Sequence, residues 1–178
     1  MLAVAFTAFF VFSATFNYLP FYLSAPPISA SIRVVTLLYL AYIVGMIAGP
    51  LAGKLSNHLG SGPTMTLGSV LLAVSVSFTL IPSLGVIAAS LPVLCGGFFG
   101  IHAAALGTLN RRLTGSRGRA NSLYVLFYYL GGASGISATG YAYARAGWHG
   151  CVALAIAVLL VPFAIGLYET SRERLRRT

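Results

Sequence analysis

Six long runs of apolar residues, separated by short polar connections, dominate this sequence. The approximate ranges of the runs are 1–24, 34–53, 64–81, 85–108, 120–144 and 150–168. A helix needs roughly 20 apolar residues to cross about 30 Å of hydrocarbon, and each run comes close to that length or exceeds it. Runs such as 154–161 do not alternate as the strands of a membrane barrel would. The pattern therefore predicts an all-α membrane protein with six transmembrane helices.

Basic residues are distributed unevenly between the two ends of these helices. If six helices alternate across a membrane, nine Lys and Arg residues lie on one side, at Lys54, within 111–119 and within 169–178. Only Arg33 and Arg145 lie on the other side. Because cytoplasmic loops are enriched in Lys and Arg, both termini are expected in the cytoplasm. The chain is thus divided into a six-helix transmembrane domain, 1–168, and a basic cytoplasmic tail, 169–178.

Composition and charge narrow the partners that we expect. Apolar residues make up 58% of the chain and charged residues only 7%, so the lipid bilayer of a cell (inner) membrane is the expected surrounding. The net charge of +9 follows from the topology, and nucleic acid is not an expected partner. Cys95 and Cys151 lack the spacing of a metal or redox pair, so we expect inert thiols, no metal and no cofactor.

Polar side chains inside the runs indicate which helices face a cavity, since a polar group in lipid is costly. The first, second, fourth and fifth runs carry such side chains, whereas the third and sixth are poorer in them and are expected to face lipid. The candidate cavity residues are Asn17, Tyr18, Tyr42, His102, Tyr124 and Tyr128.

His102 has two interpretations at this stage. It is either a neutral histidine hydrogen-bonded to a neighbouring helix, or a substrate contact or proton carrier, because imidazole titrates near physiological pH. No Asp or Glu lies inside any predicted span, so a carboxylate proton relay is absent. Glu169 and Glu173 fall in the predicted tail, where Glu173 is expected to pair with Arg177 one turn later.

Small residues recur at intervals of four in several runs, as at helix contacts in membranes. They are Gly45, Gly49 and Gly53 in the second run, Gly96 and Gly100 in the fourth, and Gly131 and Gly135 in the fifth. This spacing predicts packing surfaces between helices.

The connection after the second run resembles a loop motif of the major facilitator superfamily, G-x-L-x-D-R-x-G-R-K, in its second-half copy. The residues that carry the resemblance are Gly49, Gly53, Leu55, Asn57, His58 and Gly60. Asn57 stands where that family has Asp, and His58 where it has Arg, so both departures remove charge. The segments 17–21, 38–45, 117–124, 128–132 and 147–150 are similar to bacterial drug and sugar efflux permeases of the arabinose-efflux type.

This resemblance implies the C-terminal six-helix half of a twelve-helix transporter, an efflux antiporter of a small molecule rather than an enzyme. In such a fold the substrate lies between two halves, near the midplane of the membrane. The expected partner is therefore an N-terminal half or a second copy of the chain. The first run starts at Met1 without a polar leader, which favours a fragment or a half-length gene product.

Two other functions remain open from the sequence. The chain could be a non-transporting accessory or structural membrane subunit, or an inactive truncated product. Residues 132–135 also match the G-x-S-G of rhomboid serine proteases, whose chemistry needs a histidine within reach of Ser134. His149 is expected roughly 10 Å away in depth, and His102 lacks that family's spacing, so no catalytic residue is predicted.

Overall fold

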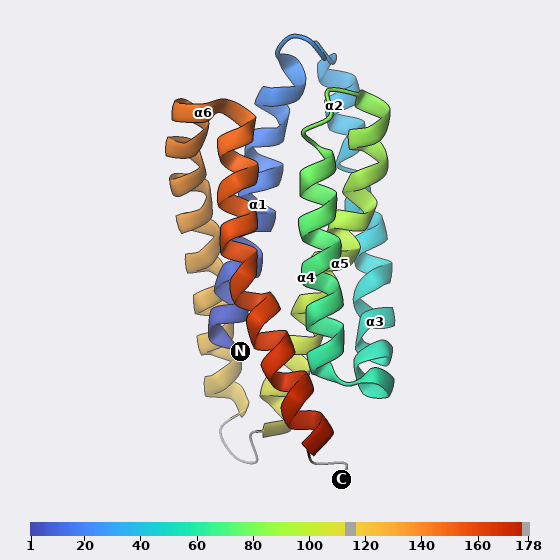
Figure 1. Ribbon diagram of the computed structural model, residues 1–178, viewed down its shortest axis with the longest axis vertical. Coiled ribbons are helices and arrows are strands. Elements are labelled where there is room, and N and C mark those ends of the chain that lie inside the picture. The colour runs from blue at the N-terminus through green and yellow to red at the C-terminus, as the bar shows by residue number, and fades with distance from the viewer. Residues whose placement is uncertain (113–116, 176–178) are drawn as a thin grey trace.

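The computed structural model describes residues 1–112 and 117–175, and these residues form an elongated bundle of helices (Figure 1). The described residues contain no strand, which confirms the all-α prediction. The helices are α1 (Leu2–Ser24), α2 (Ile32–Leu38), α3 (Ala41–Leu59), α4 (Ser61–Phe78), α5 (Leu84–Arg112) and α6 (Arg117–Leu175). They run up and down the long axis, and the start of α1 lies toward the same end as the end of α6.

Helices α2 and α3 follow each other with only a tight turn between them. The backbone N–H of Leu40 donates to the carbonyl of Leu37 at 3.0 Å, and that of Ile43 donates to Leu40 at 3.0 Å, a 3₁₀ pattern. Together Ile32–Leu59 makes one apolar stretch of 28 residues. The helix thus continues past the predicted end of the second run at 53 and stops at Gly60, whose φ of 105° favours glycine.

Helix α6 turns back on itself at one point. Ala146 and Gly147 have non-helical backbone angles, and the φ of 56° at Gly147 lies in the left-handed region. This kink, between the predicted runs 120–144 and 150–168, separates a first arm (117–145) from a second arm (148–175) that lies beside it in the opposite direction (Figure 1). Residues 169–175 continue the second arm as helix, because nothing in their backbone interrupts it.

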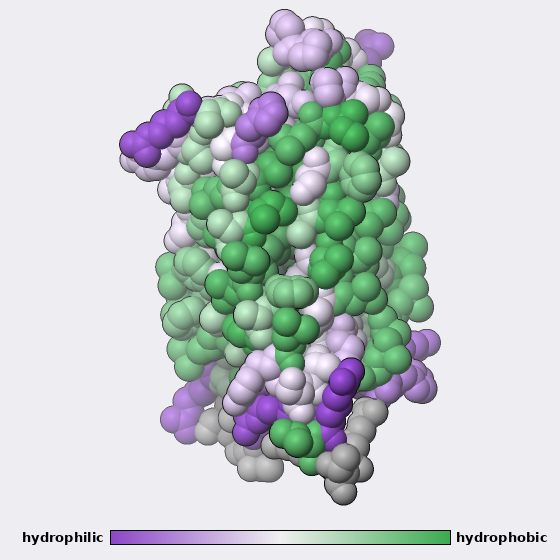
Figure 2. Space-filling view, viewed as in Figure 1, coloured by the Kyte–Doolittle hydropathy of each residue, from purple (hydrophilic) through white to green (hydrophobic). Residues whose placement is uncertain are grey.

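Five helices in the described ranges are long and apolar enough to cross a membrane when α2 and α3 are taken together. The last of them, Gly118–Leu175, has 58 residues, far more than the roughly 20 that one crossing needs. Figure 2 shows a broad hydrophobic band over α4 and the second arm of α6, with hydrophilic residues gathered toward both ends. This distribution is typical of a protein whose middle is covered by hydrocarbon.

Glycines let the helices approach closely at two contacts. A Cβ added to Gly131 in the first arm of α6 would collide with the backbone carbonyl of Phe6 in α1. Where α4 meets α5, a Cβ on Gly68 would lie 2.7 Å from the carbonyl oxygen of Gly97. The bundle therefore has two tightly packed pairs, α1 with the first arm of α6 and α4 with α5, with the second arm packed along α4.

Candidate functional site

A groove of about 330 Å³ opens between α1, the α2–α3 junction and the first arm of α6. Aromatic side chains make up most of its wall, and polar groups are few. Its lining residues are Phe9, Phe12, Ser13, Phe16, Asn17, Tyr39, Tyr42 and Ile136. The lining residues of α1 recur at intervals of three or four, as in Phe9, Phe12 and Phe16 or in Phe9, Ser13 and Asn17, which places them on one helix face.

The aromatic rings of the groove contact one another in a continuous layer. The ring of Tyr42 lies 4.6 Å from that of Phe16 and 5.3 Å from that of Phe12, the latter at an angle of 79°. Tyr39 and Tyr42 are nearly parallel, with 6.2 Å between ring centroids. Such offset and edge-on arrangements are the favoured geometries of aromatic pairs, so the layer is well packed before any ligand arrives.

Two of the polar groups in the groove are already engaged within the protein. The hydroxyl of Tyr39 donates to the carbonyl of Phe16 at 2.8 Å, and that of Ser13 donates to the carbonyl of Gly132 at 3.1 Å. Among the described residues, no hydrogen bond is found for the Asn17 amide or the Tyr42 hydroxyl. These two groups are therefore the ones that a ligand in the groove can reach with its own polar atoms.

A second cluster lies behind the groove, between α5 and the first arm of α6. The hydroxyl of Tyr124, which is 1% exposed, lies 3.1 Å from Nδ1 of His102. The ring of Tyr128 meets that of His102 edge-on at 5.4 Å. Phe9 stacks on Tyr128 at 3.7 Å and so joins this cluster to the groove wall.

The structure separates the six candidate residues from the sequence into three places. Asn17 and Tyr42 line the groove, and His102, Tyr124 and Tyr128 form the cluster behind it. Tyr18 lies elsewhere: its ring is 5.7 Å from that of Tyr143, and its hydroxyl lies against Gly140 in α6. Sequence reasoning missed the phenylalanines and Tyr39, although the spacing of Phe9, Phe12 and Phe16 on one helix face was a signal for them.

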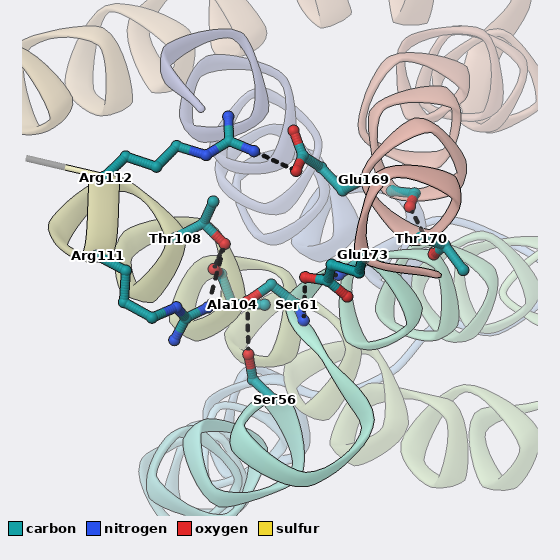
Figure 3. Close-up of polar contacts among 11 residues, drawn as sticks. Ser56, Ser61, Ala104, Thr108, Arg111, Arg112, Glu169, Thr170 and Glu173 are labelled. Carbon is teal, nitrogen blue, oxygen red and sulfur yellow. Dashed lines mark hydrogen bonds and ion pairs between the residues drawn. The ribbon is translucent and has the colours of Figure 1, made fainter. Parts of the chain in front are cut away.

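A cluster of charged and hydroxyl side chains lies where α3, α5 and α6 end and α4 begins (Figure 3). Arg112, the last residue of α5, forms an ion pair with Glu169 in the second arm of α6. The Glu169 side chain is 5% exposed and that of Arg112 is 42% exposed. Glu169 is thus a buried, paired carboxylate.

Glu173, one turn beyond Glu169, caps the start of α4. Its Oε1 accepts hydrogen bonds from the backbone N–H groups of Ser61 at 3.0 Å and Gly62 at 3.4 Å (Figure 3). A carboxylate at a helix N-terminus satisfies free N–H groups and interacts favourably with the helix dipole. The pairing of Glu173 predicted from the sequence was with Arg177, which lies outside the described residues.

The hydroxyl of Ser61 extends this polar cluster to α3 and α5. It lies 2.9 Å from the hydroxyl of Ser56, and it accepts a hydrogen bond from Nη2 of Arg111 (Figure 3). The same Arg111 nitrogen lies 3.4 Å from Oγ1 of Thr108. Helix ends from four elements are therefore tied together by charged and hydroxyl groups.

The loop-motif residues take different roles around this cluster. Asn57 and His58 are exposed at the end of α3, Gly53 has open space beside it, and a Cβ on Gly49 would be in ordinary contact with Phe99. Gly60 is the motif residue with a defined backbone role. Besides its positive φ, a Cβ there would collide with the Glu173 carboxylate.

The described residues carry little that resembles a catalytic or metal centre. They contain no group of three or more His, Cys, Asp or Glu side chains able to hold a metal ion. Ser134 and His149 are exposed on α6, and Nδ1 of His102 is directed to Tyr124. Cys95 and Cys151 are buried free thiols.

The long apolar helices and hydrophobic band define a multi-pass integral membrane protein. The chain belongs to the Major Facilitator Superfamily, whose family model matches residues 1–177. This confirms the resemblance found in the sequence. Members of this family are transporters and not enzymes, which excludes the serine-protease interpretation of Ser134.

Curated relatives agree with this assignment. The chain is 31% identical over 155 residues to the inner membrane transport protein YnfM of Escherichia coli, an alignment that covers 87% of this chain and 37% of YnfM. It is 26% identical to the uncharacterized MFS-type transporter YybF of Bacillus subtilis, over 87% of this chain and 38% of YybF. An uncharacterized transporter of Buchnera aphidicola is 25% identical over 94% of this chain and 40% of its own length. The chain thus matches well under half the length of these relatives.

Proposed function

We propose that this chain is a six-span half of a secondary transporter that moves a small molecule outward across the inner membrane by alternating access. The two arms of α6 supply the fifth and sixth spans. The binding groove is completed by an N-terminal-type half or by a second copy of the chain.

The aromatic groove is the observation that carries this proposal. It opens on α1, α3 and the first arm of α6, and the His102 cluster adds α5 behind it. In the same order, these are the first, second, fifth and fourth proposed spans. None of the described residues that line the groove comes from α4 or from the second arm. A transporter of this family holds its substrate between two halves, so a one-sided groove is what a single half would offer.

Exposed apolar surface next to the groove supports a missing partner half. Only 17% of the Ile32–Leu59 window is buried within the chain. Met46, Ile47 and Leu51 on α3 are each about 60% exposed. The chain also spans only 37 to 40% of the length of the relatives described above. A second six-span unit seated on this face would cover it and enclose the groove.

The proposed orientation places both termini in the cytoplasm. The nine-to-two distribution of Lys and Arg supports it. A green fluorescent protein fused after Thr178 should fluoresce, and alkaline phosphatase fused there should be inactive. Fusions after Ser83, in the connection between α4 and α5, should give the opposite result. Active phosphatase after Thr178 contradicts the orientation.

Thiol labelling in native membranes tests the cavity itself. Asn17→Cys and Tyr42→Cys should react with a water-soluble maleimide, because a transport cavity is filled with water in at least one state. The matched control is Leu160→Cys, which is 62% exposed but lies on the second arm, where we expect lipid. The two native cysteines are buried and should contribute little background. Equal reactivity at Asn17→Cys and Leu160→Cys would favour an accessory or structural subunit instead.

A further inference from the structure

We propose that the groove binds the ring system of an uncharged, planar aromatic compound that carries one or two hydrogen-bonding groups. This inference rests on the proposed function and names the class of its substrate. It is carried by the composition of the groove wall, by the absence of charge on that wall and by the polar groups that remain free there.

The wall is built for contact with flat, π-rich molecules. Five of its eight lining residues are Phe or Tyr, and their rings already form an offset and edge-on layer. A planar aromatic guest extends the same arrangement, because each added ring pair gains stabilisation beyond the apolar area that it buries. The volume of about 330 Å³ lies at the small end of the range for ligand pockets, which suits one or two fused rings.

The charge of the wall argues against ionic substrates. None of the described residues that line the groove is Asp, Glu, Lys or Arg. An anion would meet the negative faces of the aromatic rings without a compensating cation. A cation would be attracted by the ring faces but would lose its hydration without a carboxylate to replace it. An uncharged guest avoids both costs.

The supply of hydrogen-bonding groups argues against sugars. Tyr39 and Ser13 direct their hydroxyls to backbone carbonyls, which leaves the Asn17 amide and the Tyr42 hydroxyl. On this wall a sugar would find only these two partners, and any hydroxyl held against the aromatic rings would lose its hydrogen bonds to water without replacement, which is costly. An aromatic compound with a single hydroxyl or amide matches what these two side chains can satisfy.

Equilibrium binding of matched bicyclic probes to the 178-residue chain in lipid nanodiscs tests this inference. The probes are 2-naphthol, its saturated analogue decahydro-2-naphthol, the anion 2-naphthoate and the cation N-methylquinolinium. Empty nanodiscs correct for partition into lipid. We expect saturable binding of 2-naphthol, binding of the saturated analogue weaker by about tenfold, and no competition from either ion.

Substitutions in the groove wall test whether 2-naphthol binds in the groove. Phe16→Leu and Tyr42→Leu should each weaken 2-naphthol binding about twofold to tenfold, the range of one aromatic contact. Phe163→Leu is the control, since Phe163 lines a separate apolar groove between α4 and the second arm. Circular dichroism confirms that each variant keeps its helix content.

A second readout needs no aromatic variant. 2-Naphthol should slow maleimide labelling of Asn17→Cys, and it should not slow labelling of His58→Cys at the exposed end of α3. Equal affinity for the saturated analogue, preference for either ion, or unchanged binding in both groove variants overturns the substrate class. The labelling contrast between Asn17→Cys and Leu160→Cys does not depend on any ligand, so the proposed function can stand when this inference fails.

Discussion

The hydroxyl of Tyr124 lies 3.1 Å from Nδ1 of His102 and joins the first arm of α6 to α5 directly behind the aromatic groove. Tyr124 is 1% exposed, so this hydroxyl has no access to water as an alternative partner. Of the two interpretations of His102 made from the sequence, a histidine bonded to a neighbouring helix has a defined partner here. The role of His102 as a substrate contact or proton carrier stays a prediction.

Removing the Tyr124 hydroxyl should measurably loosen the bundle. We expect Tyr124→Phe to lower the free energy of unfolding by about 1 kcal/mol, since interhelical hydrogen bonds in membranes contribute about 0.6 and up to about 1.7 kcal/mol. Thermal unfolding in detergent checks this. In a His102→Leu background the same change should cost little, because the partner is already gone. Equal losses in both backgrounds would mean that the two side chains do not interact.

The carboxylate of Glu173 should stabilise the start of α4. Glu173→Ala removes the acceptor for two backbone N–H groups and should cost about 1 kcal/mol, as for other helix caps. Glu173→Gln keeps an oxygen acceptor and should cost less. Arg174→Ala, an exposed neighbour, is the control and should leave the unfolding temperature unchanged. A Glu173→Ala protein as stable as the control would show that water replaces the cap.

Removing one partner of the ion pair between Arg112 and Glu169 should lower the free energy of unfolding more than replacing both partners together. Arg112→Ala leaves a buried carboxylate unpaired and should destabilise by about 1–3 kcal/mol. We expect a smaller loss than for a fully buried ion pair, because the Arg112 side chain is 42% exposed and remains partly hydrated. The double variant Arg112→Ala/Glu169→Leu should recover part of the loss, which a double-mutant cycle measures. Additive losses would argue that the pair contributes no coupling.

Glycine-to-alanine substitutions should distinguish glycines at close helix contacts from glycines with open space beside them. Gly131→Ala places a methyl group against the backbone of Phe6 and should destabilise by about 1–3 kcal/mol or prevent folding. Gly96→Ala is the matched control, because nothing lies within 4 Å of its added Cβ. We expect the control to be neutral or slightly stabilising, since alanine favours helix. Yield and unfolding temperature of the two proteins in the same detergent give the comparison.

The same glycines show how far sequence spacing alone can lead. Intervals of four pointed to Gly131 and Gly135, which do meet the backbone of α1, but also to Gly96, which faces open space. The close contact of α5 belongs to its neighbour Gly97, opposite Gly68. One residue rotates the position by about 100° around a helix. The spacing therefore predicts that a helix has a face of small residues. Which of these residues makes the close contact depends on where the neighbouring helix packs.

The carboxylates illustrate a second limit of sequence reasoning. Glu169 and Glu173 follow the last apolar run, and so the sequence predicts them in a basic cytoplasmic tail. Their partners Arg112 and Ser61 are 57 and 112 residues away along the chain. The periodic pattern of apolar and polar residues within one helix contains no information on pairs so far apart in the sequence. The groove wall was missed for a related reason, since phenylalanine in an apolar run is indistinguishable from a lipid-facing residue until the neighbouring helices are placed.

The distance along the chain between Ser61 and Glu173 also bears on the order of assembly. During synthesis the first residue of α4, Ser61, is made 112 residues before Glu173, its cap. Until α6 has been made and has folded back at Gly147, the backbone N–H groups of Ser61 and Gly62 lack this partner. The last turns of α6 therefore cap α4 only after the helices between them have been made. A chain that stops before Glu173 lacks this cap, so the start of α4 should stay unfastened to the rest of the bundle.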